Sequence, residues 1–413
     1  EKGLLTGRQG ERAKWYAPAV ERLDRAGRWE RGHLSPTAVD RLYGQRVPMS
    51  ASRMDKYKSC HFSYFMRYGL RARERKEITV DPAEFGTFVH YILEHTARDV
   101  CEAGGFSRVS LERTQELAME YAGRYRREYF AGLGERTSRQ DYLLERNLQE
   151  LRAVVRELWE ELAQSRFQPA GFEVQFGPGG AMPPVEIPGG AMPAQLRGFV
   201  DRLDLYERDG QTYVRVVDYK TGRKDFDYCD VLNGLGLQML LYLFALEDHG
   251  RAYLGVSAEA AGVLYFPARA AVLPVEGPVE SQEARLLRQK EARRKGLLLL
   301  DEDVLQAMDG SEESRFLPVK RGKTGALTGD LATGQQLDQL KSYVFRLLAR
   351  LVDGIAGGQV EPNPYSRGNH NACRYCEYAS ACHLDLWGQP RSYRAVSAEE
   401  FWEQVEQEGT SHD

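Results

Sequence analysis

Apolar positions along the chain follow a helical period in some segments and a strand-like alternation in others. After Pro82, the apolar residues Phe85, Phe88, Val89 and Ile92 recur at intervals of three and four, which is typical of one face of an α-helix. We expect a helix to begin there. The other predicted helices cover residues 52–60, 107–168, 235–246 and 335–355, the second of them as a charged helical insertion.

Two strands are predicted on either side of Asp209 and Gly210. Asp-Gly favours a two-residue hairpin turn because both central positions must accept a positive φ. A later apolar run, residues 261–266, predicts a buried strand. The order helix, hairpin, helix, strand, with further helices around it, indicates an α/β domain with a mixed sheet flanked by helices.

The chain has 413 residues, of which 42% are hydrophobic and 28% charged, as in ordinary globular proteins. We expect a lead-in from an upstream region over residues 1–48, one domain over 49–390 and a polar tail over 391–413. Residues 177–194 and 280–330 are expected to be loops or irregular. No apolar run approaches the roughly 18 residues that span a bilayer. The net charge of −4 requires any nucleic-acid contact to be local.

The hairpin carries the main candidate chemistry. If Asp209-Gly210 closes it, Asp201 faces Asp218 across the ladder, and two opposed carboxylates repel each other. A divalent cation between them would reverse that repulsion. Lys220 follows two residues after Asp218 and so shares its strand face. This pattern favours a metal-dependent phosphodiester hydrolysis site over a solvated polar face. Asp204 points to the opposite face, with Arg215 as its predicted partner.

Four cysteines form a second candidate site. Cys373, Cys376 and Cys382 follow a C-x2-C-x5-C spacing, and Cys60 is the candidate fourth ligand. Structural zinc more often uses two C-x2-C pairs, so the three-plus-one arrangement favours an iron–sulfur cluster, with zinc as the alternative. Either would join the N- and C-terminal parts of the domain. Such cysteine use also indicates a reducing, cytoplasmic compartment.

These residues fall into ordered motifs: Tyr57-x2-Cys60, Gly86-x3-His90, Gly198-x2-Asp201, Asp218-Tyr219-Lys220, Gln238-x3-Tyr242 and the C-terminal cysteine group. Together they resemble the RecB-type nuclease family of the PD-(D/E)XK superfamily. Within that family they look like the iron–sulfur version found in AddB-type subunits of bacterial AddAB helicase–nucleases. The resemblance covers roughly residues 48–390, and it implies a restriction-endonuclease-like fold.

The resemblance also implies residue roles. His90, Asp201, Asp218 and the main-chain carbonyl of Tyr219 match the ligands of Mg²⁺, with Mn²⁺ as a substitute, and Lys220 matches the catalytic lysine. Gln238 and Tyr242 match a helical motif that meets the DNA backbone or braces the site. Cys60, Cys373, Cys376 and Cys382 match the ligands of a 4Fe-4S cluster.

The implied activity is a DNA exonuclease that processes double-strand ends for recombinational repair, on the strand with the 5′ end. The implied partners are single-stranded and duplex DNA ends and an AddA-type helicase–nuclease subunit. That subunit would supply ATP hydrolysis, because this chain has no phosphate-loop motif. Two alternatives remain: a free-standing iron–sulfur exonuclease of the CRISPR-adaptation type, and a non-catalytic clamp that binds DNA ends.

Overall fold

The computed structural model describes residues 16–23, 32–74, 82–129, 138–188, 190–269, 281–311, 314–323 and 325–410. Parts of the predicted lead-in, helical insertion, loops and tail lie outside these ranges. The chain divides into two compact units, each built from segments that are distant in sequence. The first unit comprises residues 1–45, 56–74 and 353–394, and the second comprises residues 46–55, 75–352 and 395–413.

A six-stranded sheet forms the centre of the second unit, in the order β11-β8-β7-β6-β5-β2. Its strands are β2 (Gln168–Phe176), β5 (Gly198–Arg208), β6 (Gln211–Lys220), β7 (Ala258–Pro267), β8 (Lys295–Leu299) and β11 (Leu331–Ala332). The pairs β2/β5, β5/β6 and β7/β8 are antiparallel, whereas β6/β7 and β8/β11 are parallel. The predicted mixed sheet is therefore confirmed.

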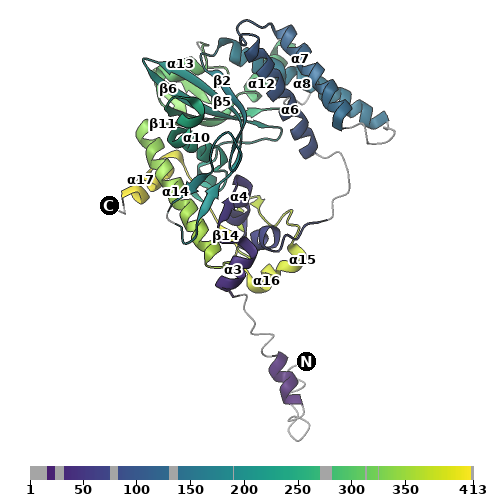
Figure 1. Cartoon of the computed structure of the whole chain (residues 1–413), viewed down its shortest axis with the longest axis vertical. Helices are drawn as coiled ribbons and strands as arrows, with labels where there is room; N and C mark the ends of the chain where they lie inside the picture. The colour runs from purple at the N-terminus through teal and green to yellow at the C-terminus, as the bar shows by residue number, and fades with distance from the viewer. Residues whose placement is uncertain are drawn as a thin grey trace. The chain divides into compact units, whose positions relative to one another are not determined.

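Helices flank this sheet, as expected. The described helices of the second unit are α6 (Pro82–Glu102), α7 (Leu111–Tyr129), α8 (Ser138–Gln164), α9 (Tyr228–Leu232), α10 (Gln238–His249), α11 (Arg251–Leu254), α12 (Ser281–Glu291), α13 (Glu302–Met308), α14 (Gly334–Ala356) and α17 (Ala398–Thr410). Helices α6, α7 and α8 pack together, and α6 contacts β2 and β5 (Figure 1). Helix α10 contacts β6 and β7. Residues Met239–Leu246 of α10 are all buried, which explains why this helix is apolar on every side.

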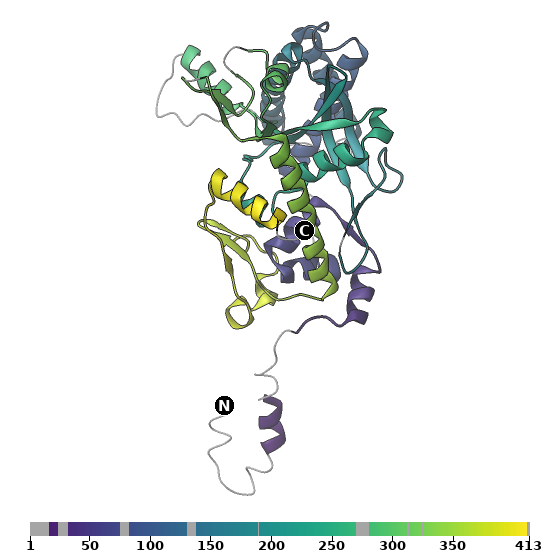
Figure 2. The same ribbon diagram turned by 90° about the vertical axis from the view of Figure 1, so that its left-hand side faces the viewer.

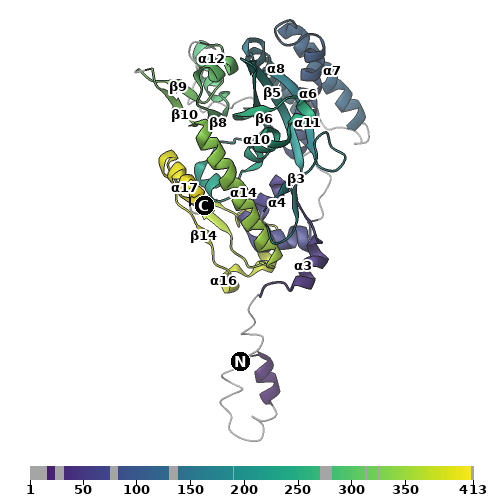
Figure 3. The same cartoon turned by 60° about the vertical axis from the view of Figure 1, so that its left-hand side comes forward.

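Two segments that we expected to be loops are more regular than that. Residues 177–194 contain β3 (Val185–Ile187), which pairs with β4 (Ala194–Leu196), and β4 also pairs with β1 (Val47–Met49). Residues 280–330 contain α12, β8, α13 and the hairpin of β9 (Val319–Arg321) and β10 (Leu327–Gly329). Figure 3 shows α12, β8 and this hairpin together. The expectation was wrong because a short buried run, Leu297–Leu299, is hidden by the charged residues around it.

Residues 398–410 of the predicted polar tail form the ordered helix α17. Phe401 and Val405 are fully buried, and the Phe401 ring lies 4.9 Å from the ring of Tyr228 on α9. Arg350 on α14 pairs with Glu408 on α17 at 2.9 Å, and Figure 2 shows α17 in yellow near the green α14. The acidic composition of the tail thus reflects one solvated face of an amphipathic helix.

The first unit is smaller and built from short elements. It contains α3 (Pro36–Tyr43), α5 (His61–Tyr64), the π-helix η1 (Phe65–Gly69), β12 (Tyr365–Arg367), β13 (His370–Asn371), α15 (Ala379–Cys382), α16 (Leu384–Trp387) and β14 (Arg391–Ser392). Its three strands form a sheet in the order β13-β12-β14. Helix α4 (Ala51–Ser59) contributes residues to both units. Within the described ranges, no helix is long and apolar enough to cross a membrane.

Candidate active site

Asp201 and Asp218 lie on the two strands of one hairpin. Asp209 and Gly210 have φ angles of 54° and 81°, as the predicted turn requires. The ladder pairs run without a bulge from Arg208–Gln211 to Arg202–Val217. The predicted register is therefore confirmed as far as Arg202 and Val217. Asp201 and Asp218 lie one residue beyond this last pair, and their direct opposition stays a prediction.

The same register pairs Asp204 with Arg215. The guanidinium of Arg215 donates from Nε to Oδ2 of Asp204 at 2.8 Å, and both side chains are fully buried. This confirms the predicted partner of Asp204. Since Asp204 is committed to a buried ion pair, it is separate from the carboxylates of the candidate site.

His90 reaches the hairpin from α6. Its Nε2 lies 2.7 Å from the main-chain oxygen of Tyr219, and its Nδ1 lies 3.5 Å from Oδ2 of Asp201. The main-chain N–H of Tyr219 donates to the same Oδ2 at 2.7 Å. The structure thus brings His90, Asp201 and the carbonyl of Tyr219 together, although they come from three different elements.

Lys220 lies beside Asp218, as the strand alternation predicts. Its Nζ is 2.5 Å from Oδ2 of Asp218, and the lysine side chain is 34% exposed while the aspartate side chain is 4% exposed. The lysine therefore contacts a buried carboxylate while part of its own side chain is exposed to solvent. An ammonium in this position can reach a phosphate that approaches from solvent.

Glu173 on β2 is a further acidic residue that the sequence interpretation missed. The ladder pairs Phe172–Arg202 and Val174–Val200 bracket it, so Glu173 stands opposite Asp201 on the other side of β5. Its backbone has a φ of 47°, which is uncommon for a residue with a side chain. One ligand atom each from His90, Glu173 and Asp201 lie within 4.8 Å of one another.

The crowded carboxyl groups resist ionisation. Burial, and then the charge of Asp218, raise the pKa of Asp201 to about 6. Burial, and then the charge of Asp201, raise the pKa of Glu173 to about 7. Carboxylate and carbonyl oxygens are the ligands that Mg²⁺ prefers, and an added imidazole also suits Mn²⁺. The donor set and its repulsion therefore fit a divalent cation.

Gln238 and Tyr242 share one face of α10, as their spacing predicts. The Tyr242 hydroxyl bonds with the Gln238 side chain and with the backbone of Phe199 on β5. The Tyr242 ring is 3% exposed and stacks on Phe176 at 5.5 Å. Because the hydroxyl is committed to these partners, Tyr242 braces the start of β5, three residues before Asp201.

A family model described as the PD-(D/E)XK nuclease superfamily matches residues 48–383, and this range contains all the residues placed above. The chain belongs to the PD-(D/E)XK nuclease superfamily. The family that the sequence motifs predicted is thereby confirmed.

Known relatives of this PD-(D/E)XK chain are named as the B subunit of an ATP-dependent helicase/deoxyribonuclease. The protein from Clostridium acetobutylicum is 31% identical over 384 residues, 91% of this chain and 33% of the relative. Those from Acetivibrio thermocellus and Symbiobacterium thermophilum are 33% and 35% identical, over 91% and 90% of this chain and 34% and 33% of theirs. The chain spans about a third of the length of these relatives.

The first unit of this PD-(D/E)XK chain contains the four cysteines predicted to bind a metal. Cys60 packs in a cluster with Phe62 and Tyr378, against which Cys376 and Cys382 also lie. Burial, and then the charges of Cys60, Cys376 and Cys382, raise the pKa of Cys373. The four thiols therefore come from opposite ends of the sequence into one small unit, and none of them forms a disulfide.

The Cys60 thiol lies in a buried apolar cluster. Burial raises the pKa of its thiol, and the nearby backbone of Ser63, Asn363 and Phe62 opposes that rise. Among these four described cysteines, no three sulfurs lie within 4.8 Å of one another. Sulfurs around one tetrahedral zinc stand only about 3.8 Å apart, because each Zn–S bond is about 2.3 Å. The other two cysteines, Cys101 and Cys229, lie in the helices α6 and α9 of the second unit.

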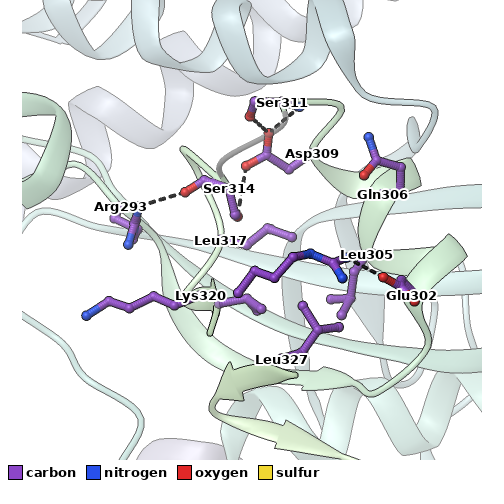
Figure 4. Close-up of a pocket in the computed structure, with 12 residues that line it drawn as sticks. Arg293, Glu302, Leu305, Gln306, Asp309, Ser311, Ser314, Leu317, Lys320 and Leu327 are labelled. Atoms are coloured by element: carbon purple, nitrogen blue, oxygen red, sulfur yellow. Dashed lines mark hydrogen bonds and ion pairs between the residues drawn. The ribbon is translucent and has the colours of Figure 1, made fainter. Parts of the chain in front are cut away.

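A cavity of about 390 Å³ lies between α13 and the β9–β10 hairpin. Figure 4 shows its lining, in which Glu302, Asp309 and Lys320 alternate with leucines. None of the candidate site residues lines it. Its mixed charges give no preference for one class of ligand, so the hairpin remains the candidate active site.

Proposed function

We propose that this chain is the deoxyribonuclease part of a helicase–nuclease that processes double-strand DNA ends, using Mg²⁺ or, in its place, Mn²⁺. One observation carries the proposal: Asp201, Asp218, the Tyr219 carbonyl and Lys220 converge at one end of the β5–β6 hairpin. The superfamily match and the names of the relatives support the choice of DNA as substrate.

Asp201, Asp218, the carbonyl of Tyr219 and His90 would hold the cation, with Glu173 close enough to contribute. When bound, a divalent cation acidifies water and polarises a phosphate. His90 can act as a ligand only as the neutral imidazole. Its hydrogen bond to the Tyr219 carbonyl fixes the orientation of the ring and keeps this oxygen within reach.

Lys220 has a separate role in the proposed reaction. Its Nζ contacts Asp218 while the side chain remains one-third exposed, so it can contact a scissile phosphate without leaving the carboxylate. Its positive charge would stabilise the negative charge that develops on the phosphate oxygens in the transition state. The buried position of Asp218 keeps the lysine from turning away into solvent.

The cysteines of the first unit are proposed to bind a 4Fe-4S cluster with a structural role. The three-plus-one spacing supports the cluster, and the presence of all four cysteines in the first unit supports a shared site. Hydrolysis needs no electron transfer, so a cluster would stabilise the unit by tying residue 60 to residues 373–382.

The relatives are named as subunits of an ATP-dependent helicase/deoxyribonuclease. By analogy, the proposed partner is an AddA-type helicase–nuclease subunit that unwinds the duplex, and the proposed substrate is the strand with the 5′ end. We place the protein in the bacterial cytoplasm on the same grounds. The resemblance to AddB-type subunits supports these assignments.

The test is cleavage of linear single- and double-stranded DNA by anaerobically purified protein, with Mg²⁺ or with chelator. Asp218→Asn removes one ligand charge. Asp209→Asn is the matched control, because it makes the same change in the same hairpin and Asn-Gly suits the turn equally well. We expect metal-dependent cleavage by the wild type and the control, and none by Asp218→Asn. DNA binding without cleavage, alone and with a helicase partner, would instead indicate an end-binding clamp.

A further inference from the structure

Tyr219 belongs to two environments at once. Its main chain lies in the candidate active site, where the N–H donates to Asp201 and the carbonyl accepts from His90, both at 2.7 Å. Its side chain is 2% exposed and points into the interior. There the phenol oxygen lies 3.3 Å from Nη1 of Arg202. The position of this one side chain therefore bears on the position of two main-chain groups of the site.

Arg202 is itself fixed by buried charges. It is fully buried and donates from Nε and Nη2 to the two carboxylate oxygens of Asp204, at 2.9 and 3.1 Å. A two-pronged pair of this kind fixes the plane of the guanidinium. With two of its nitrogens engaged, the remaining Nη1 is held toward the Tyr219 hydroxyl.

Glu161 extends the network to other parts of the second unit. This carboxylate on α8 accepts from Arg202 at 3.4 Å, from Arg215 at 3.1 Å and from Arg294 at 2.8 Å. Burial alone would raise the pKa of Glu161, but the charges of Arg294, Arg215 and Arg202 outweigh it and lower the pKa to about 2. The glutamate is thus ionised, and it joins α8 and the start of β8 to the catalytic hairpin.

Such a network resists displacement. A buried charge that loses its partner is far less stable than a paired one, so Arg202, Asp204 and Glu161 keep their relative positions. We propose that Arg202, through the Tyr219 hydroxyl, is a positioning residue that sets the Tyr219 carbonyl for cation binding. This inference rests on the proposed function, since it assigns a purpose to the cation site of the nuclease.

Tyr219→Phe tests the inference because it removes only the hydroxyl. Tyr213→Phe is a matched control: Tyr213 is also a buried tyrosine of β6 whose hydroxyl accepts from an arginine, Arg208, at 3.2 Å. Tyr213 lies near the turn and away from the candidate ligands. Both variants keep the ring, so we expect both to fold, which thermal unfolding would verify.

The main readout is Mn²⁺ binding without DNA, followed by the electron paramagnetic resonance of free Mn²⁺. We expect Tyr219→Phe to weaken Mn²⁺ about tenfold, as losses of residues that orient metal ligands commonly do, and Tyr213→Phe to bind like the wild type. In cleavage assays, Tyr219→Phe should need more Mg²⁺ for half-maximal rate while approaching the wild-type rate at saturation.

Equal Mn²⁺ affinities of Tyr219→Phe, Tyr213→Phe and the wild type would overturn the inference. An equal loss in both variants would also overturn it, because the effect would then be general to buried tyrosines of β6. A wild-type protein that binds Mn²⁺ but cuts no DNA would contradict the proposed function alone, since the affinities of the two variants would still decide the role of Arg202.

Discussion

The Tyr242 hydroxyl occupies the space that a β-carbon at position 198 would need. Gly198 begins β5, and Tyr242 crosses over it from α10 to bond with the backbone of Phe199. The glycine is therefore required for close approach rather than for an unusual backbone angle. It allows a buried tyrosine to hold the strand that carries Asp201.

We predict that Gly198→Ala lowers the free energy of unfolding by about 1–3 kcal/mol, because the added methyl group overpacks the site. The loss should be smaller when Tyr242→Phe is also present, since the hydroxyl oxygen is the atom nearest to the new methyl group. Urea unfolding of the wild type, both single variants and the double variant measures this coupling. Identical losses in the two backgrounds would show that residue 198 acts independently of Tyr242.

Cation affinity should rise with pH. The carboxyl groups of Asp201 and Glu173 have pKa values of about 6 and about 7, and a cation binds their ionised forms. Mn²⁺ affinity should therefore increase from about pH 5 and level off above about pH 8. Glu173→Gln removes the group with the higher pKa, so the affinity of this variant should level off nearer pH 7. Calorimetric titrations across this range measure both curves, and a flat curve for the wild type would refute the prediction.

The same shifts have the opposite effect on the metal-free protein. Both pKa values are raised above their ordinary values, so the unfolded chain loses these protons at lower pH than the folded chain does. The free energy of unfolding should therefore fall as pH rises from about 4 to about 7. Saturating Mn²⁺ should reverse this slope because it binds the ionised folded state.

The hairpin could be predicted because its information is local. Asp209-Gly210 specifies the turn, and the alternation of β5 and β6 then fixes the pairing of Asp204 with Arg215. Glu173 could not be found in the same way, because β2 and β5 are not joined by a tight turn. A glutamate with a positive φ also has no distinctive sequence pattern. The sequence offered one partial signal. Phe172, Val174 and Phe176 alternate as in a strand, and this pattern places Glu173 between two apolar residues.

Long-range convergence was predictable only where the residue type is rare. Cys60 and Cys373 were assigned to one site because buried thiols at metal-ligand spacing have few other roles, and the structure places both in the first unit. The network of Arg202, Glu161 and Arg294 was not foreseen, since arginine and glutamate are common on any surface. Only the packing of α8 and β8 around the sheet shows that these charges are buried.

Lys220→Gln should lower the rate of DNA cleavage at saturating Mg²⁺ by about 10²- to 10³-fold, as the loss of one group that stabilises transition-state charge commonly does. Mn²⁺ affinity should not fall, because the variant removes a positive charge beside Asp218. Lys224→Gln is a control that removes a lysine from the loop that follows β6. Single-turnover cleavage and Mn²⁺ binding separate the two effects, and a parallel loss of both would show that Lys220 acts by holding Asp218 in place.

Cys60→Ser should abolish binding of the iron–sulfur cluster, whereas Cys101→Ser should retain it. Cys60 lies in a buried cluster against which Cys376 and Cys382 pack, while Cys101 lies in the second unit on α6. Because a cluster would tie residue 60 to residues 373–382, its loss should also lower the melting temperature of the first unit. Iron, sulfide and zinc analysis of anaerobic preparations measures the first effect, and calorimetry measures the second. Zinc without iron in the wild type would replace the proposed cluster with a tetrahedral zinc site.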